Sequence, residues 1–597
     1  MKALAFVQQA MAAGAAALAL ASSATAAEPA KAPDAAKVEM TWGVKVPLRD
    51  GVQLNATVYR PRNQAQPAPC IFTLTPYIAQ SYHDRGVYFA AHGLPFLTID
   101  VRGRGNSGGE FRPLIQEARD GYDVVEWLAK QPYCNGKVSM WGGSYAGYGQ
   151  WAAAKERPPH LATIVPVASP YAGADFPYRN NIASSYLFQW LLFTSGSASQ
   201  AMIFGDSELW GSIWKRRYET GEAFATLPGV FGSDQPTLRE WIAHPQIDAY
   251  YDAYGATPEQ FRAIDIPILT ITGSYDDDQP GAMAWYKTYM QLASPQQRAR
   301  HYLIIGPWDH AGTRTPRAKV GGLEFGPDSL VDLPKLHVDW YNWTMADGPR
   351  PGFLEKPVAY YVMAAERWRY ADSLEAVTAE TRPYYLDSTT NAVEVLASGS
   401  LTTSGPGKGR ADHYVYDPRD VSTAELQTTV EPSDLTSQKL VYAYDGKQLV
   451  YHTPPFDRDT EVSGFFKLAA WIAIDQADTD FNASVYEIDR NGQSILLTSD
   501  QVRARYRESQ REAKLVSTKA PQRYDFDHFT FVSRKIAAGS RLRLVLGPIN
   551  SIYAQKNYNS GKPVSEETMA DARPVTVTLV HDKAHPSALY VPIGQPE

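Results

Sequence analysis

The chain is poor in cysteine, in excess basic charge and in long apolar runs, and each shortage excludes a class of protein. Of its 597 residues only two are cysteine, and the formal net charge is −7. Without a basic face to neutralise phosphates, nucleic acid is not an expected partner. The histidines and cysteines do not cluster at zinc-site spacing, and no repeat recurs at a fixed period. We therefore expect neither a zinc module nor a repeat protein.

The only extended apolar run lies at the N-terminus. Lys2 precedes an apolar segment at residues 11–21, and Ala24-Thr25-Ala26 matches a signal-peptidase cleavage site. The segment is too short to span a bilayer, and no later stretch of about 20 apolar residues follows. The pattern predicts a secretory signal over residues 1–26. We expect export to a bacterial periplasm or out of the cell, with no membrane attachment after signal removal.

The two cysteines lie next to two predicted strands. Cys70 opens an apolar run that ends at residue 75, and Cys134 comes just before the run at residues 137–141. If these runs are neighbouring parallel strands, both thiols lie at the same edge of the sheet. An exported protein can oxidise such a pair, so Cys70 and Cys134 are a candidate disulfide. Two free buried thiols are the alternative.

What the chain does contain is an ordinary apolar content of 44%, together with 36 tyrosines and 14 tryptophans. Strand and helix patterns alternate over residues 38–174, which predicts a parallel α/β sheet with right-handed crossovers. Strands are predicted at residues 44–48, 53–59, 70–75, 95–101, 137–141 and 163–167, and helices at 81–92, 116–130 and 148–155.

The rest of the chain divides into three further parts. Residues 175–263 carry aromatic, helical segments and predict a helical cap, in which Thr257 before Pro258 is a helix start signal. Residues 264–348 return to strand and helix. A Gly/Pro-rich boundary follows, and residues 352–597 predict a β-sandwich or jelly roll. Strands are expected there at 358–363, 441–444, 464–473, 483–488, 542–546 and 575–580.

A catalytic serine is suggested by the segment Gly142-Gly-Ser-Tyr-Ala-Gly147. An apolar strand, a sharp glycine-flanked turn, Ser144 and a helix form the context of a nucleophile elbow. The second glycine falls one place later than in the usual G-x-S-x-G pattern. A Gly-Ser turn that merely starts a helix is the alternative reading.

Two further strand ends supply the partners that such a serine needs. The strand predicted at residues 268–272 leads into Asp276, Asp277 and Asp278, and the strand at 302–305 leads into His310. The order serine, acid, histidine and the placement at strand ends agree with an α/β-hydrolase. Taken singly, the aspartates could form a solvated turn and the histidine a structural one.

These residues resemble a known family. Gly142-Gly-Ser-Tyr-Ala-Gly147, Thr75-Pro-Tyr77, Asp100-Val-Arg-Gly-Arg-Gly-Asn-Ser-Gly108 and Gly306-Pro-Trp-Asp-His310 are similar to motifs of the cocaine esterase and X-Pro dipeptidyl-peptidase family of α/β-hydrolases. In the β region the likeness continues in Asp478-Thr-Asp-Phe481, Arg503-Ala-Arg-Tyr-Arg-Glu-Ser509 and His585-Pro-Ser587. The resemblance implies an α/β-hydrolase domain with a helical cap and a C-terminal jelly roll.

The resemblance also implies roles. It makes Ser144 the nucleophile, Asp276 the orienting acid and His310 the base, with the Tyr77 hydroxyl and the Tyr145 backbone N–H as oxyanion donors. It implies neither a metal nor an organic cofactor.

A free α-amino group on the substrate is a narrower expectation. Family members that bind one carry carboxylates two and three residues after the triad acid and one at the start of the cap. Asp278 holds the first of these places, Gln279 replaces the second, and Asp175 is a candidate for the third. The alternative is that Asp175 and Asp278 form a helix cap and a solvated turn.

The sequence therefore predicts an exported serine hydrolase that cleaves a small ester or amide, or a short peptide, through an acyl-enzyme. An X-Pro dipeptidyl-peptidase is the alternative within the enzyme class. Outside it, the jelly roll would be a carbohydrate-binding module on an inactive hydrolase scaffold. Many family members form dimers or tetramers, so a homo-oligomer is expected by analogy.

Overall fold

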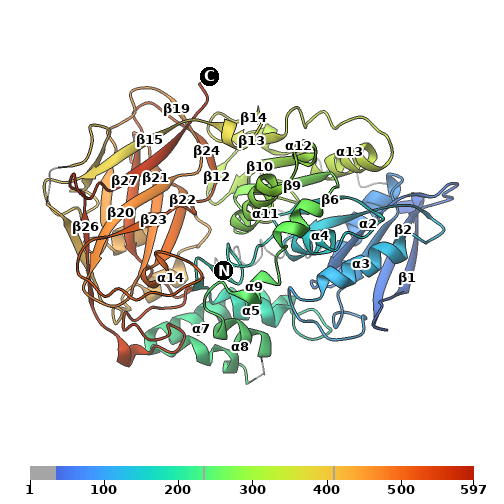
Figure 1. The fold of residues 1–597 in the computed structure, drawn as a ribbon, viewed down its shortest axis with the longest axis horizontal. Helices are drawn as coiled ribbons and strands as arrows, with labels where there is room; N and C mark the ends of the chain where they lie inside the picture. Colours follow the sequence, from blue (N-terminus) through green and yellow to red (C-terminus); the bar gives the residue numbers. More distant parts are fainter. Residues whose placement is uncertain (1–34, 233–234, 408–409, 597) are drawn as a thin grey trace.

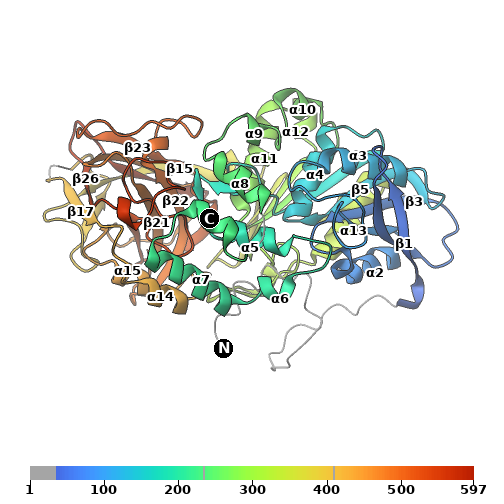
Figure 2. The ribbon, with the colours of Figure 1, turned by 90° about the horizontal axis from the view of Figure 1, so that it is seen from below.

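The computed structural model describes residues 35–232, 235–407 and 410–596, so the predicted signal segment and its cleavage site lie outside the described residues. An α/β domain and an all-β domain lie side by side, and cap helices run along the edge where they meet (Figures 1 and 2). In the described ranges, helices long and apolar enough to cross a membrane are absent.

The first sheet has ten strands in the order β1-β2-β4-β3-β5-β6-β9-β10-β13-β14, and its central strands from β4 to β13 run parallel. The strands are β1 Val38–Pro47, β2 Gln53–Pro61, β3 Ala68–Thr75, β4 Phe96–Asp100, β5 Cys134–Gly143, β6 Leu161–Val167, β9 Ile268–Tyr275, β10 His301–Asp309, β13 Val358–Val362 and β14 Arg367–Ala371. Its helices are α2 His83–Ala91, α3 Glu117–Leu128, α4 Tyr145–Lys155, α11 Gln279–Leu292, α12 Pro295–Arg298 and α13 Leu333–Met345.

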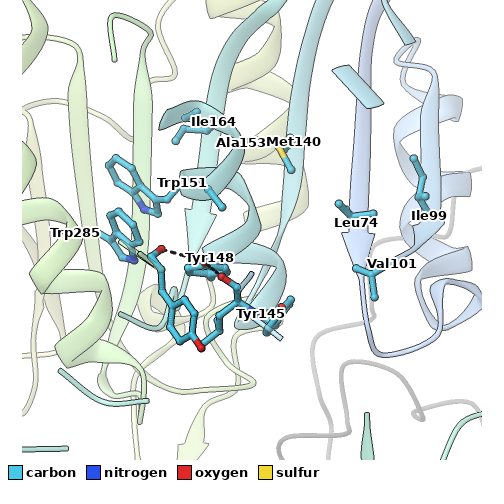
Figure 3. Close-up of a cluster of buried hydrophobic side chains, with 14 of the residues drawn as sticks. Leu74, Ile99, Val101, Met140, Tyr145, Tyr148, Trp151, Ala153, Ile164 and Trp285 are labelled. Carbon is cyan, nitrogen blue, oxygen red and sulfur yellow. Dashed lines mark hydrogen bonds between the residues drawn. The ribbon is translucent and has the colours of Figure 1, made fainter. Parts of the chain in front are cut away.

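The parallel strands are continuously apolar because helices cover both faces of the sheet. Every residue of β4 and β10 is buried. On one face, Trp151 of α4 stacks on Trp285 of α11 with ring centroids 5.0 Å apart and planes 5° from parallel (Figure 3). This packing fixes the carboxyl ends of β5, β9 and β10 at a common edge, where Ser144, Asp276 and His310 follow.

The cap is inserted between β6 and β9. It contains the short strands β7 Tyr178–Arg179 and β8 Ile182–Ala183, then α5 Tyr186–Phe193, α6 Ala201–Phe204, α7 Ser207–Thr220, α8 Pro236–Ala243, α9 Ala249–Asp252 and α10 Pro258–Ala263. The helix start predicted at Thr257 is present as a capping box, in which Thr257 and Gln260 bond to each other's backbone N–H.

The second sheet has thirteen strands and forms the all-β domain. They are β15 Thr378–Asp387, β16 Gly399–Thr402, β17 Asp412–Tyr416, β18 Leu449–His452, β19 Thr460–Gly464, β20 Lys467–Ile474, β21 Asp480–Ile488, β22 Ser494–Arg503, β23 Gln522–Phe526, β24 Val532–Ile536, β25 Arg541–Pro548, β26 Val575–Val580 and β27 Ala588–Gly594. Two short helices, α14 Ala424–Thr429 and α15 Lys439–Ala443, interrupt it, and a small hairpin, β11 Lys319–Val320 and β12 Leu323–Glu324, precedes it. The predicted fold class, an α/β-hydrolase domain with a helical cap followed by an all-β domain, is confirmed.

Two predicted strands differ from the structure. The run at residues 441–444 is mostly helix α15 rather than a strand, because a short apolar run does not distinguish the two states. The strand predicted at 358–363 exists as β13, but it pairs with β10 and extends the first sheet. The first sheet therefore continues past the predicted boundary at residues 347–351.

The candidate disulfide is not formed. Cys70 and Cys134 are two free, buried thiols, although β3 and β5 are neighbouring parallel strands as expected. The thiol of Cys70 donates to the Ala68 carbonyl and that of Cys134 to the Lys137 carbonyl. Each thiol thus donates within its own strand, and the two thiols also interact with each other.

A buried arginine, paired within the all-β domain, joins that domain to the cap. Arg503 donates from Nε and Nη2 to the two carboxylate oxygens of Asp480, at 2.8 and 2.9 Å, and from Nη1 to the Asn181 carbonyl at the start of the cap. Its side chain is only 2% exposed. Such a pair must remain complete, because removal of one partner leaves a buried charge without compensation.

We expect Arg503→Met to lower the free energy of unfolding by about 3–5 kcal/mol, because the Asp480 carboxylate would stay buried without its cation. The midpoint of urea denaturation, followed by tryptophan fluorescence, measures the loss. Arg523→Met is the matched control, since Arg523 and Asp525 form an exposed pair whose loss should cost less than about 1 kcal/mol. Equal losses in the two variants would contradict this account of the interface.

Candidate active site

The turn between β5 and α4 holds Ser144 in a strained backbone conformation, with φ 59° and ψ −129°. Two glycines make the turn possible. A Cβ at Gly142, whose φ is 144°, would lie 2.6 Å from the Ala146 Cβ. A Cβ at Gly147 would lie 2.6 Å from the Val167 carbonyl oxygen on β6. The second glycine therefore stands where α4 approaches the neighbouring strand, one position later than in the usual pattern.

Tyr77 and Tyr145 lie beside the serine. The Tyr77 hydroxyl is 3.2 Å from Ser144 Oγ. Tyr145 is the first residue of α4, where a backbone N–H has no partner within the helix. Burial raises the pKa of Tyr77 to about 12, although its hydrogen bonds with Ser144 and Trp190 lower it, so the hydroxyl keeps its proton at neutral pH. Both donors predicted from the resemblance therefore lie next to Ser144.

The cap contributes Trp190 to this group. The indole N–H of Trp190 donates to the Tyr77 hydroxyl oxygen at 3.3 Å. The same oxygen lies 3.2 Å from Ser144 Oγ, and either of these two hydroxyls can be the donor. Trp190 thus positions a hydroxyl that lies on a different domain.

Arg104 ties the Tyr77 loop to the end of helix α5. Its side chain is fully buried and donates to the carbonyl of Pro76 at 2.8 Å and to that of Ser195 at 2.6 Å. The carbonyls of Phe193, Gly196 and Ala198 are further acceptors. Burial lowers the pKa of Arg104 to about 10, which leaves it cationic at neutral pH. One guanidinium therefore holds the residue before Tyr77 against the helix that carries Trp190.

His310 and Asp276 form a buried pair at the same sheet edge. His310 Nδ1 lies 2.7 Å from Asp276 Oδ1, and Asp276 Oδ2 accepts from the Thr272 hydroxyl at 2.8 Å. The Asp278 backbone N–H also donates to Asp276 Oδ1. Burial alone would raise the pKa of Asp276, but His310 and these donors lower it below its ordinary value. The carboxyl therefore stays ionised and fixes the imidazole through Nδ1.

Burial and the Arg314 cation lower the pKa of His310, but the carboxylates of Asp278 and Asp276 raise it more, so the net shift is upward. Asp278 Oδ2 lies 3.9 Å from His310 Nδ1. Burial raises the pKa of Asp278 well above its usual range, against the attraction of His310. The two groups therefore titrate together rather than separately.

Asp175 and Gln279 have mainly structural partners. The Asp175 carboxylate accepts from the backbone N–H of Tyr171 at 2.9 Å and of Gly281 in the first turn of α11 at 2.6 Å. Gln279 accepts from the Phe531 backbone N–H at 2.5 Å and donates to the Phe531 carbonyl at 3.1 Å. Asp175, at the start of the helical cap domain, thus accepts from the N-terminal turn of α11. Gln279 attaches the loop that carries Asp276 to the all-β domain.

All the predicted site residues apart from the cysteines line one cavity of about 1400 Å³. Ser144, Asp276, His310, Tyr77, Tyr145, Asp175 and Asp278 contribute from the α/β domain and the start of the cap. The hydrogen bonds of Trp190, Arg104 and Gln279 are not predicted from the sequence. Arg104 lies within the glycine-rich motif at residues 100–108. An arginine among glycines in a family motif is the one sequence feature that points to a role for this side chain. Trp190 and Gln279 had no such signal, because their partners are distant in sequence.

Comparison with known families agrees with this arrangement. A model described as X-Pro dipeptidyl-peptidase (S15 family) matches residues 50–312, and one described as the X-Pro dipeptidyl-peptidase C-terminal non-catalytic domain matches residues 351–590. The chain belongs to the X-Pro dipeptidyl-peptidase (S15) family. Membership covers both the α/β domain and the all-β domain, as the resemblance in the motifs predicted.

Relatives of this S15 chain include esterases. Cocaine esterase of Rhodococcus sp. (strain MB1 Bresler) is 25% identical over 590 residues, which span 92% of this chain and 98% of that protein. Among solved structures, an α-amino acid ester hydrolase has a TM-score of 0.79 at 19% identity, covering 96% of this chain and 100% of its own. An aminopeptidase from the marine sediment archaeon Thaumarchaeota archaeon has a TM-score of 0.77 at 20% identity, with coverages of 96% and 99%.

The two structural matches show the shared fold. The family itself shows that this chain is a serine hydrolase, for which small esters, amides or peptides are fitting substrates.

Proposed function

We propose that this S15 chain hydrolyses a carboxylic ester or amide through an acyl-enzyme on Ser144, with His310 as base and Asp276 as orienting acid. The observation that carries the proposal is the strained Ser144 turn with the Tyr77 hydroxyl at 3.2 Å, in the same cavity as a buried His310–Asp276 pair at 2.7 Å. These are the parts that a Ser-His-Asp mechanism needs.

The reaction follows from these positions. His310 Nε2 takes the Ser144 proton as Oγ attacks the carbonyl carbon, and Asp276 stabilises the imidazolium through Nδ1. The Tyr77 hydroxyl and the Tyr145 N–H stabilise the tetrahedral oxyanion. His310 then gives its proton to the leaving alcohol or amine. Water repeats the sequence and releases the acid. A single oxyanion donor typically accounts for about 3–4 kcal/mol of barrier lowering.

The proposal extends to the location of the protein and to the acyl group of its substrate. The pattern of Lys2, an apolar run and Ala24-Thr25-Ala26 supports export through a cleaved signal. An acyl group with a free α-amine is supported by Asp278, a partly exposed carboxyl in the cavity beside His310. Asp175 supports it less, because both of its oxygens already accept backbone N–H groups.

A second candidate, release of X-Pro dipeptides, is favoured by the family model and by the same carboxyl group, which can receive a peptide N-terminus. Initial rates on α-amino acid esters and on X-Pro anilides separate the two. An anilide rate that exceeds the ester rate would favour the peptidase.

The first test is covalent labelling of the full chain with a fluorophosphonate, followed by intact-mass analysis and peptide mapping. We expect one adduct, on Ser144, because the turn exposes an activated Oγ. Ser144→Ala should abolish the adduct and the hydrolysis while the fold survives. A labelled Ser144→Ala protein, or a folded wild type without an adduct, would refute the assignment.

The pH profile tests His310. A general base acts in its neutral form, so kcat/KM should fall as pH drops through the pKa of the free enzyme. Because the carboxylates of Asp278 and Asp276 raise the pKa of His310, we expect the midpoint above 6.5. Asp278→Asn should move it downward, since one of those carboxylates is lost. A wild-type midpoint at or below 6.5 would contradict this electrostatic account.

The bond between Trp190 and Tyr77 can be isolated with a double-mutant cycle. Tyr77→Phe should lower kcat by about one to three orders of magnitude. Trp190→Phe keeps an aromatic ring but removes the N–H that positions the hydroxyl, so kcat should fall by about two- to tenfold with little change in KM. In the Tyr77→Phe background the same change should have no further effect.

Trp241→Phe is the matched control for that cycle. Trp241 is fully buried in the cap and packs against Phe176, which also contacts Trp190. Within the described ranges its indole N–H makes no hydrogen bond of standard geometry and interacts with the Tyr254 hydroxyl rather than with Tyr77. A loss from Trp190→Phe that is the same in both backgrounds would mean that packing, not positioning of the hydroxyl, is its role.

A further inference from the structure

The cavity that contains Ser144 is larger than a small ester needs. Drug-sized ligands occupy pockets of about 300–1000 Å³, whereas this cavity measures about 1400 Å³. Besides the residues around Ser144, its lining includes helix α7 of the cap and strands of the all-β domain. The additional volume therefore lies between the cap and the all-β domain.

One face of the second sheet forms the floor of this additional volume. Asn482, Ser484 and Tyr486 alternate along β21 and so point to one side of the sheet. Across the register, Asn482 lies opposite Gly547 and Ser484 opposite Val545 on β25. We call the floor the set Gln448, Asn482, Ser484, Tyr486, Leu496, Ser499, Val545 and Gly547, all of which line the cavity.

The opposite face of the same strands is core. Phe481, Ala483 and Val485 of β21 and Leu544 and Leu546 of β25 are fully buried in the hydrophobic cluster of the all-β domain. The strands are therefore amphipathic in the manner of a sheet with one face toward the core. What distinguishes them is that the other face points into the cavity that contains the catalytic serine.

The chemistry of the floor is uncharged. None of its eight residues is ionisable below the range of a tyrosine, and five carry amide or hydroxyl groups. Asn482 Nδ2 donates to Ser484 Oγ at 2.9 Å, which holds these two groups side by side. The neighbouring Arg543, opposite Tyr486, is not among the residues that line the cavity, and its guanidinium donates to His452 and Gln438.

The wall across from the floor is aromatic. Trp210 and Trp214 of α7 line the cavity and stack on each other with ring centroids 5.3 Å apart. Lys215 beside them is occupied by Glu425 at 2.9 Å and by Glu219 at 3.6 Å. A ligand between wall and floor therefore meets aromatic surface on one side and small polar side chains on the other, while the charged residues Arg179, Glu208 and Glu431 line the cavity outside these two sets.

We propose that this floor is a second substrate compartment, which receives an elongated, uncharged part of the substrate that combines apolar surface with hydroxyl or amide groups. The proposal rests on the hydrolase function proposed above, since the compartment opens onto Ser144. An ionised group is disfavoured there because burial of a charge without a partner is costly. Apolar surface is favoured by the aromatic wall, and the amide and hydroxyl groups of the floor require partners of the same kind.

The test uses p-nitrophenyl esters of three acyl groups: acetyl, a long neutral acyl chain with an internal amide, and a chain of the same length that ends in a carboxylate. A second set carries the same long groups on the alcohol side of an acetate ester. We expect kcat/KM for the long neutral ester of one set to exceed that of the acetate at least tenfold. The carboxylate analogue should lose most of that gain.

Two variants fill the compartment. Ser484→Trp and the half-buried Asn482→Trp should each lower kcat/KM for the preferred long ester at least tenfold and leave the acetate within twofold. Asn482→Trp keeps the test available if Ser484→Trp does not fold. Val415→Trp, on the exposed side of β17, is the matched control and should change neither rate.

The outcomes separate this inference from the function on which it rests. Equal losses for the long ester and the acetate, or no loss for either, would overturn the compartment. A long neutral ester no better than acetate in both sets would do the same. In each case acetate hydrolysis and labelling of Ser144 continue to report on the hydrolase assignment. Absence of both in the wild type would instead refute that assignment.

Discussion

The backbone of Ser144 has a conformation that only close contacts on both sides can hold, and the rest of the site depends on it. Residues other than glycine rarely adopt a φ of 59°, so the surrounding structure must compensate for the strain. Gly142 lets the first turn of α4 approach β5, and Gly147 lets the same helix approach β6. The stacking of Trp151 on Trp285 holds α4 against α11. The exposed Oγ is thus a product of packing around it.

A second constraint is the burial of carboxyl groups near one histidine. Asp276 is kept ionised by His310, Thr272 and a backbone N–H, while burial raises the pKa of Asp175 and Asp278 well above the ordinary range. Such an arrangement is costly unless each group has a partner. Asp175 finds its partners in the first turn of α11 and in Tyr171. Asp278 lies near His310, so protonation of either group changes the pKa of the other.

The sequence was sufficient for features that depend on local pattern and order. Continuous apolar strands, the glycine-flanked Ser144 and the positions of Asp276 and His310 after two strands indicated the fold class and the site. It was insufficient where the answer depends on distant partners. Residues 441–444 predict a strand because a short apolar run does not distinguish the two states, but most of them belong to helix α15. The pairing of β13 with β10, and the bonds of Trp190, Arg104 and Gln279, join segments that no local pattern connects.

These bonds between distant segments connect the all-β domain to the residues around Ser144. It carries no residue of the Ser144, His310 and Asp276 group, yet Phe531 bonds with both backbone groups to Gln279, three residues after Asp276. The cap in turn reaches Tyr77 through Trp190, and Arg503 joins the cap to the all-β domain. A shift of either part would therefore move the loop that carries Asp276 or the Tyr77 side chain. Because atoms in such a site must hold their positions closely for catalysis, docking of the three parts is a condition of activity rather than a consequence of the fold.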